Sequence, residues 1–211
     1  PPIRNFITDI NLVENQLYGD GLYKITYSSF SNAWLDNTAV KCFNTDDVIG
    51  GIWGFGSRYI AGVFNSSLTI VVFNDYDYKG DWVKIELPFS IKMTKYGILR
   101  RSDTQTFINR APNDFKIFAS NDDIIWVEIA SQTSTTYTND LYEESIDNKN
   151  YYKYYVLVVN KVSGDTNNLN FLEWFIYGKE STAIKSGYLE FNGSNWIVND
   201  YPSINDFTGT L

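Results

Sequence analysis

The sequence predicts an all-β domain, an antiparallel β-sandwich or jelly roll, on three observations. Short apolar segments separated by turn residues recur along most of the chain. In several of them apolar and polar side chains alternate, as in strands with one buried face. Helical periodicity is nearly absent, because only Ile10, Val13 and Leu17 share one helix face, in a short segment rich in asparagine. Many short strands at such intervals are typical of sandwiches and jelly rolls.

The predicted strands follow one another at short intervals. Residues 22–27 alternate directly after a Gly-Asp-Gly turn signal. In residues 82–87 three apolar side chains face one way and the charged Lys84 and Glu86 face the other. Pro88 is expected to end this strand, because it has no N–H to donate to a ladder. The further predicted strands are 68–73, 91–99, 115–119, 125–130, 151–160 and 171–177.

A domain boundary is predicted near residues 178–182, where the chain becomes polar. Beyond it, residues 188–191 and 195–198 are typical of a hairpin that turns at Asn192-Gly193. We therefore expect one domain over residues 1–180. Residues 181–211 are expected to form a linker and the beginning of a second β-sandwich, or a C-terminal tail that adds an edge strand to the first.

Composition excludes several classes of protein. The chain has 211 residues with 17 basic and 25 acidic side chains, a net charge of −8, which argues against binding to the phosphates of nucleic acids. Histidine is absent, so Ser-His-Asp, Cys-His and HExxH chemistries are excluded. With one cysteine, no internal disulfide can form. No apolar run is long enough for membrane insertion.

Catalysis would have to depend on carboxylates, and their pattern argues against an enzyme. The acidic pairs Asp46-Asp47, Asp122-Asp123 and Glu143-Glu144 consist of adjacent residues in turn-like sequence. A glycosidase needs two carboxylates that face each other across a cleft, whereas neighbours in a strand point to opposite faces. We interpret these acids as turn residues that bind the backbone of their own turns.

Four segments, residues 42–53, 80–88, 110–126 and 154–178, resemble in order the discoidin family, also called F5/8 type C or galactose-binding-like modules. The most specific is 110–126, with Arg-x-Pro at its start, Ser-Asn-Asp at 120–122 and then Trp126. The paired terminal cysteines of many animal members are absent, and Asn44-Thr45 replaces an Asp-Gly of the family. The chain looks most like discoidin modules in structural proteins of large DNA viruses and phages. Its C-terminal residues resemble the opening of a laminin G-like or concanavalin-like sandwich.

The resemblance implies a structural Ca²⁺ ion. Calcium takes six to eight oxygen ligands, which loop carbonyls and carboxylates commonly supply. The positions that match are the side chains of Asn44, Asp47 and Glu173 and the backbone carbonyls of Cys42 and Thr45. The alternative is a loop held together by its Asn and Asp side chains alone.

The resemblance also implies ligand binding through loops at one end of the barrel, where Arg58, Tyr59 and the loop at Arg100-Arg101 match best. Aromatic rings stack on the apolar face of a sugar, and polar side chains bind its hydroxyls. Several aromatic residues stand in loop-like sequence without a periodic partner. The alternative is that they pack against their own loops or a neighbouring subunit. The expected ligand-binding residues are Trp34, Arg58, Tyr59, Tyr76, Tyr78, Arg100 and Arg101.

The sequence thus predicts a non-catalytic recognition or assembly module of a larger virion or surface protein. Its expected partners are glycans or other capsid, fibre or surface subunits, and its expected location is the virion, or otherwise the extracellular space or a bacterial cell surface. An alternative is a carbohydrate-binding module of a secreted bacterial glycan-processing enzyme. A complete enzyme of the galactose-binding-like fold is a third hypothesis, against which the missing histidine counts.

Overall fold

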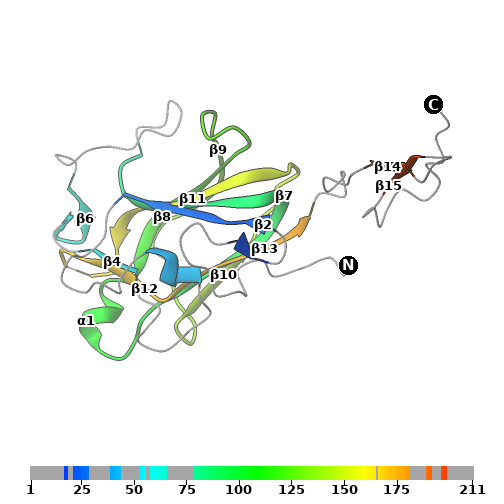
Figure 1. The fold of residues 1–211 in the computed structure, drawn as a ribbon. Coiled ribbons are helices and arrows are strands. Elements are labelled where there is room, and N and C mark those ends of the chain that lie inside the picture. The colour runs from blue at the N-terminus through cyan, green and yellow to red at the C-terminus, as the bar shows by residue number, and fades with distance from the viewer. Residues whose placement is uncertain are drawn as a thin grey trace.

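The computed structural model describes residues 17–18, 21–28, 39–43, 53–55, 58–65, 78–164, 166–180, 189–191 and 196–198 (Figure 1). In this part of the chain, helical structure amounts to the 3-10 turn η1 (Ala39–Phe43) and the single turn α1 (Gln105–Ile108). All other regular elements are strands, paired in antiparallel fashion. The all-β prediction is confirmed.

The strands, in chain order, are β1 (Leu17–Tyr18), β2 (Gly21–Leu22), β3 (Lys24–Tyr27), β4 (Trp53–Phe55), β5 (Tyr59–Ile60), β6 (Val63–Phe64), β7 (Asp81–Leu99), β8 (Pro112–Ser120), β9 (Val127–Gln132), β10 (Leu141–Ser145), β11 (Tyr152–Val162), β12 (Leu169–Phe171), β13 (Glu173–Glu180), β14 (Leu189–Phe191) and β15 (Trp196–Val198).

The 19-residue strand β7 belongs to both layers of the sandwich. Its first half pairs with β3 on one side and β11 on the other, and β8 and β9 continue that layer beyond β11. Its second half pairs with β10 and β13. One strand therefore fixes how the two layers lie against each other.

Pro88 lies inside β7 and does not end it, contrary to the sequence prediction. The ladder partners of β7 extend over Asp81–Glu86 in one layer and Ile91–Leu99 in the other. The ladder between β7 and β11 shifts register between Glu86 and Ile91, so its regular pairing is interrupted over residues 87–90. Pro88 thus occupies the stretch where β7 passes from one layer to the next, and its missing N–H costs no ladder hydrogen bond.

The hydrophobic core lies between the two layers. Val83, Ile85 and Leu87 of β7 are fully buried, whereas Lys84 and Glu86 are partly exposed, as the alternation predicts. Burial of each large apolar side chain contributes roughly 1.5–3 kcal/mol. The other fully buried side chains of the two layers include Ile91, Met93, Tyr96, Ile98, Phe115, Ile117, Ala119, Tyr155, Leu157, Val159, Trp174 and Ile176.

A smaller apolar cluster lies on the other face of the β7–β11–β8 layer. Val156 and Val158 alternate with core residues of β11, so they point away from the core. They pack with Phe118 and Trp126, and larger aromatic side chains at the margin cover them. The partly buried side chains at the margin of the cluster are those of Tyr78, Trp82 and Tyr154.

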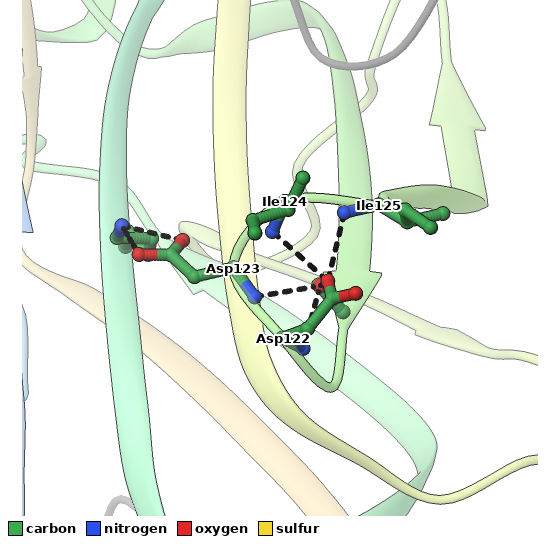
Figure 2. A network of polar contacts seen from close by, with 6 residues as sticks. Asp122, Asp123, Ile124 and Ile125 are labelled. Carbon is green, nitrogen blue, oxygen red and sulfur yellow. Dashed lines mark hydrogen bonds and ion pairs between the residues drawn. The ribbon is translucent and has the colours of Figure 1, made fainter.

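The turn between β8 and β9 is held in shape by its own side chains (Figure 2). Asp122 Oδ1 accepts hydrogen bonds from the backbone N–H groups of Ile124 and Ile125, at 2.9 and 2.8 Å. Asp123 has φ of 60°, the left-handed region that Asp tolerates, and its carboxylate lies 2.7 Å from Lys84 Nζ on β7. The turn presents Ile124 and Ile125 to solvent, 77% and 66% exposed.

The carboxylate of Glu144 joins three strands at the other side of the sandwich. Its Oε2 accepts hydrogen bonds from Tyr96 of β7 at 2.7 Å, from Tyr142 of β10 at 2.6 Å and from Gln132 of β9. Burial raises the pKa of Glu144, but the hydrogen bonds from Tyr142, Tyr96 and Gln132 together outweigh it and hold the pKa below its ordinary value. The ionised form is therefore the one that stabilises the fold.

Most predicted strands are confirmed within the described residues. The 188–191 and 195–198 pair forms the antiparallel β14–β15, and 171–177 is split at Leu172 into β12 and β13. The predicted strand 68–73 lies outside the described residues. The sequence missed β10 and the short strand β4. The division into residues 1–180 and 181–211 stays a prediction.

We predict that Glu144→Gln lowers the free energy of unfolding by about 1 kcal/mol at pH 7, because the charge-assisted part of the hydrogen bonds is lost. The pKa of Glu144 is lower in the folded than in the unfolded chain, so its contribution is complete above the unfolded value and disappears as pH falls through the folded value. Urea unfolding of both proteins at pH 7 and pH 3 measures this. If wild type and Glu144→Gln differed in free energy of unfolding by the same amount at pH 7 and at pH 3, the prediction would be contradicted.

Candidate functional site

Three segments meet at one end of the sandwich, where α1, β6 and β12 lie together in Figure 1. They are residues 58–65 with β5 and β6, residues 100–111 with α1, and the connection from β11 to β12. The backbone N–H groups of Arg58 and Tyr59 both donate to the Asn167 carbonyl, and that of Ser163 donates to the Ala111 carbonyl at 2.9 Å. The connection after β11 thus ties the other two segments together.

Arg101 and Phe107 form the centre of the segment that contains α1. The Arg101 guanidinium donates to both carboxylate oxygens of Asp103, at 2.5 and 2.6 Å. Its central carbon lies 3.4 Å from the centroid of the Phe107 ring, and that of Arg110 lies 5.1 Å from the same centroid. Two cations therefore share one aromatic ring. The hydrogen bond from Arg101 holds the pKa of Asp103 below its ordinary value, and burial lowers that of Arg110.

The surface around this ring is polar and accessible. Residues 102–106 are all exposed, and they precede Asn109, whose Oδ1 accepts a hydrogen bond from Gln105 Nε2 at 2.9 Å. Guanidinium, amide and hydroxyl groups beside a carboxylate supply both donors and acceptors. Such a set can bind a hydroxyl-rich ligand.

Tyr59 is buried in this fold, which corrects the expectation that its ring binds ligand, and Arg58 lies beside a buried carboxylate. Tyr59 is 1% exposed and its hydroxyl donates to the Val159 carbonyl at 2.9 Å, so its ring cannot stack on a sugar. Arg58 Nε lies 3.5 Å from Oδ1 of Asp81, which is fully buried. The same oxygen accepts a hydrogen bond from the Ser28 hydroxyl at 3.0 Å.

Of the other expected ligand-binding residues, Arg100 and Tyr78 contact groups other than Arg101. Arg100 Nε donates to Asp140 at 2.9 Å, and its guanidinium lies 5.0 Å from the centroid of the Tyr137 ring. Tyr78 packs against Phe118 in the cluster on the outer face of the sheet. Trp34 and Tyr76 lie outside the described residues.

Two residues of the expected calcium site are described, and they lie close together. Glu173 is 1% exposed, and Cys42 is fully buried in η1, where its thiol donates to the Ala39 carbonyl at 2.9 Å. Burial, and next the negative charge of Glu173, raise the pKa of the Cys42 thiol well above its ordinary value. Asn44, Thr45 and Asp47 lie outside the described residues. Within those that are described, no three His, Cys, Asp or Glu side chains form a group that could hold a metal.

Sequence reasoning missed Phe107 as part of the site and assigned Arg110 only to a core motif. Phe107 has no periodic partner along the chain, so its pairing with two arginines depends on the fold of the loop. The nearby Arg101 was predicted from its place in the family resemblance. No helix among the described residues has the length and apolarity to cross a membrane.

Comparison with protein-family models and with curated proteins finds no match for this sequence. Solved structures do match in fold. A family 32 module of the Clostridium perfringens protein CpGH89, in complex with GalNAc-β-1,3-galactose, has a TM-score of 0.53 at 14% identity over 74% of this chain and 94% of its own. The chain has the fold of family 32 carbohydrate-binding modules and F5/8 type C domains. This confirms the discoidin resemblance at the level of the fold.

Two further structures show how widely this fold is matched. The family 32 module of C. perfringens NanJ, in complex with galactose, has a TM-score of 0.51 at 13% identity and covers 74% of this chain and 93% of its own. An F5/8 type C domain from Bacteroides fragilis has a TM-score of 0.51 at 16% identity, over 74% and 91%. None of these similarities concerns a virus or phage protein.

We predict that Arg58→Ala lowers the free energy of unfolding by about 3–5 kcal/mol, because it leaves the buried Asp81 carboxylate without its cation. Lys149→Ala removes an ion pair whose side chains are 74% and 84% exposed, so its effect should stay within about 0.5 kcal/mol. Chemical denaturation of both variants measures this. An Arg58→Ala protein as stable as Lys149→Ala would show that Arg58 has no structural role.

Proposed function

We propose that this chain is a non-catalytic carbohydrate-binding module of the kind attached to bacterial glycan-processing enzymes, and that it binds glycans through the α1 segment. The fold supports this, since the matched modules are described in complex with galactose and GalNAc-β-1,3-galactose. The observation that carries the proposal is the Arg101–Asp103–Phe107 arrangement at the loop end of the sandwich.

The arrangement suits neutral sugar hydroxyls. Stacking on Phe107 and pairing with Asp103 fix the plane of the Arg101 guanidinium before a ligand arrives, which reduces the entropy lost on binding. The remaining N–H groups of Arg101 donate to sugar oxygens, and the Asp103 carboxylate accepts from sugar hydroxyls. The exposed amide of Gln105 supplies a further donor and acceptor beside them.

This proposal replaces the virion hypothesis by the alternative of a bacterial module. Structures that match in fold include Clostridium, Bacteroides, Streptococcus and Paenibacillus proteins, several of them glycan-processing enzymes. The proposed partners are glycans, and the proposed location is the extracellular space or a bacterial cell surface. The absence of histidine from the chain supports a binding role over a catalytic one.

Calcium is the second part of the proposal. The carboxylate of Glu173 and the backbone carbonyl of Cys42 are oxygen donors of the kind that calcium binds, whereas the protonated thiol of Cys42 is not. Asn44, Thr45 and Asp47, which follow Cys42 in the sequence, would supply the remaining oxygens. The ion would neutralise the Glu173 carboxylate in the core and hold the loop after η1 against β13.

We predict that a multimerised form of the chain binds galactose-containing glycans on an array. One shallow site should have a Kd of millimolar to high micromolar, about −4 to −6 kcal/mol. Arg101→Ala should raise the Kd at least tenfold, about 1.4 kcal/mol, because a charge-assisted donor is lost. Titration calorimetry with the best glycan of the array measures this.

Lys149→Ala, which removes one positive charge from an exposed side chain elsewhere, is the matched control and should leave the Kd unchanged. No signal from a folded chain across a broad array would exclude the carbohydrate-binding proposal. Equal affinity of Arg101→Ala and wild type would move the site away from α1.

We predict that calcium stabilises the chain, by about 2.7 kcal/mol at 100 times Kd. In a domain of this size that raises the melting temperature by roughly 5–10 °C. Thermal melts in excess chelator and in millimolar calcium measure the shift, and Glu173→Gln should abolish it. Identical wild-type melts under both conditions would remove the calcium site.

A further inference from the structure

The α1 turn depends on a neighbouring segment for its place in the fold. One turn of helix is too short to be stable alone, because nucleation costs more than its few hydrogen bonds return. Three consecutive carbonyls after α1, those of Asn109, Arg110 and Ala111, accept hydrogen bonds from the N–H groups of Gly164, Asn170 and Ser163. The distances are 2.8, 2.9 and 2.9 Å, so the end of α1 lies directly against the connection after β11.

Gly164 is the point of closest approach. A Cβ atom on this residue would lie 2.6 Å from both Cβ and Cγ of Asn109. Carbon atoms in favourable contact are about 3.5–4.0 Å apart, so any side chain here would push the two segments apart by about 1 Å. The absence of a side chain therefore sets how deeply α1 docks.

Gly62 repeats this arrangement on the other side of the same connection. Its φ is 77°, and a Cβ atom there would lie 2.4 Å from the Gly164 carbonyl oxygen. Its N–H donates to Thr166 and its carbonyl accepts from Val162. Gly164 thus lies between the β5–β6 turn and the end of α1, close to both.

Asn109 connects this contact to the polar surface of the α1 segment. It caps the C-terminus of α1 with its N–H, which donates to the carbonyls of Gln105 and Phe107, and its side chain binds Gln105. Phe107 in turn carries the Arg101 and Arg110 guanidiniums. A displacement of Asn109 therefore moves the ring on which Arg101 is stacked.

We propose that Gly164 is a positioning residue for glycan binding: the Gly164–Asn109 contact sets the docking of α1 and through it the place of Arg101 and Phe107. The proposal rests on the carbohydrate-binding function proposed above. Gly164 itself touches no ligand. It acts by letting its own backbone lie closer to the Asn109 side chain than a residue with a Cβ atom could.

The test is a set of four variants, Gly164→Ala, Asn109→Gly, the double variant, and Gly97→Ala as control. Gly97 lies in β7 with Glu143 Cγ and Phe175 Cδ2 at 3.2 and 3.3 Å from an added Cβ, a tight contact in a part of the sandwich that does not involve α1. Glycan Kd, measured well below the melting temperature, is one readout. Hydrogen exchange of the amides of residues 105–111 is the other.

Gly164→Ala should raise the Kd on the order of tenfold, because a shift of about 1 Å misplaces the Arg101 donors. It should also speed exchange in residues 105–111, and Gly97→Ala should do neither. Asn109→Gly removes both clashing atoms, so the double variant should bind as well as Asn109→Gly alone. That rescue is specific to the contact. If Gly164→Ala fails to fold, folding and binding of the double variant support the same conclusion.

Unchanged Kd and unchanged exchange in folded Gly164→Ala would overturn the positioning role. A lower melting temperature together with a wild-type Kd would also overturn it, because Gly164 would then contribute only to stability. A wild-type chain that binds no glycan overturns the proposed function, and the exchange data then still decide whether Gly164 sets the docking of α1.

Discussion

The fold depends on one strand that serves two layers. β7 pairs with β3 and β11 over its first half and with β10 and β13 over its second, and β8 joins it through one neighbour, β11. Its inward side chains, among them Val83, Ile85 and Met93, are fully buried. Pro88 can stand in the middle because the register between β7 and β11 shifts between Glu86 and Ile91. The two layers cannot slide over each other without breaking the ladders of β7.

The loop end is held by polar contacts as well as by the core. Its segments are joined by backbone hydrogen bonds and by close glycine contacts, such as that of Gly62 with Gly164, and Tyr59 and Phe64 anchor it in the core. Buried polar contacts also contribute, since the carboxylate of Asp81 lies beside the Arg58 guanidinium and accepts a hydrogen bond from the Ser28 hydroxyl. Backbone bonds constrain sequence little. This is consistent with a fold shared at identities of 12–17%.

Local sequence was enough to predict what repeats along a strand. In residues 82–87 apolar and charged side chains alternate, which identifies the buried face of the strand. The β14–β15 pair was predicted from its two apolar segments and the Asn-Gly sequence between them. Pro88 was misinterpreted because a single strand does not reveal where its partners end. β10 was missed because Glu144 is held by hydrogen bonds from three strands, which leave no apolar period.

The site was predictable only in part, because its contacts join distant residues. The family resemblance pointed to Arg101 and to Tyr59, and Arg101 stays a proposed ligand-binding residue. Tyr59 instead donates a hydrogen bond to Val159, 100 residues away, and lies in the core. Asn109 and Gly164 are 55 positions apart, and nothing near either residue indicates that they touch. A single sequence carries composition and period, but not such contacts.

The state of the single thiol has a practical consequence for labelling chemistry. A cysteine reacts as its thiolate, and Cys42 is fully buried, hydrogen-bonded to Ala39 and held protonated by burial and by the charge of Glu173. Maleimide reagents therefore spare it while the chain is folded. Since it is the one cysteine in the sequence, Ile125→Cys on the exposed β8–β9 turn would create a single attachment point for a dye or surface, with no native residue to remove first.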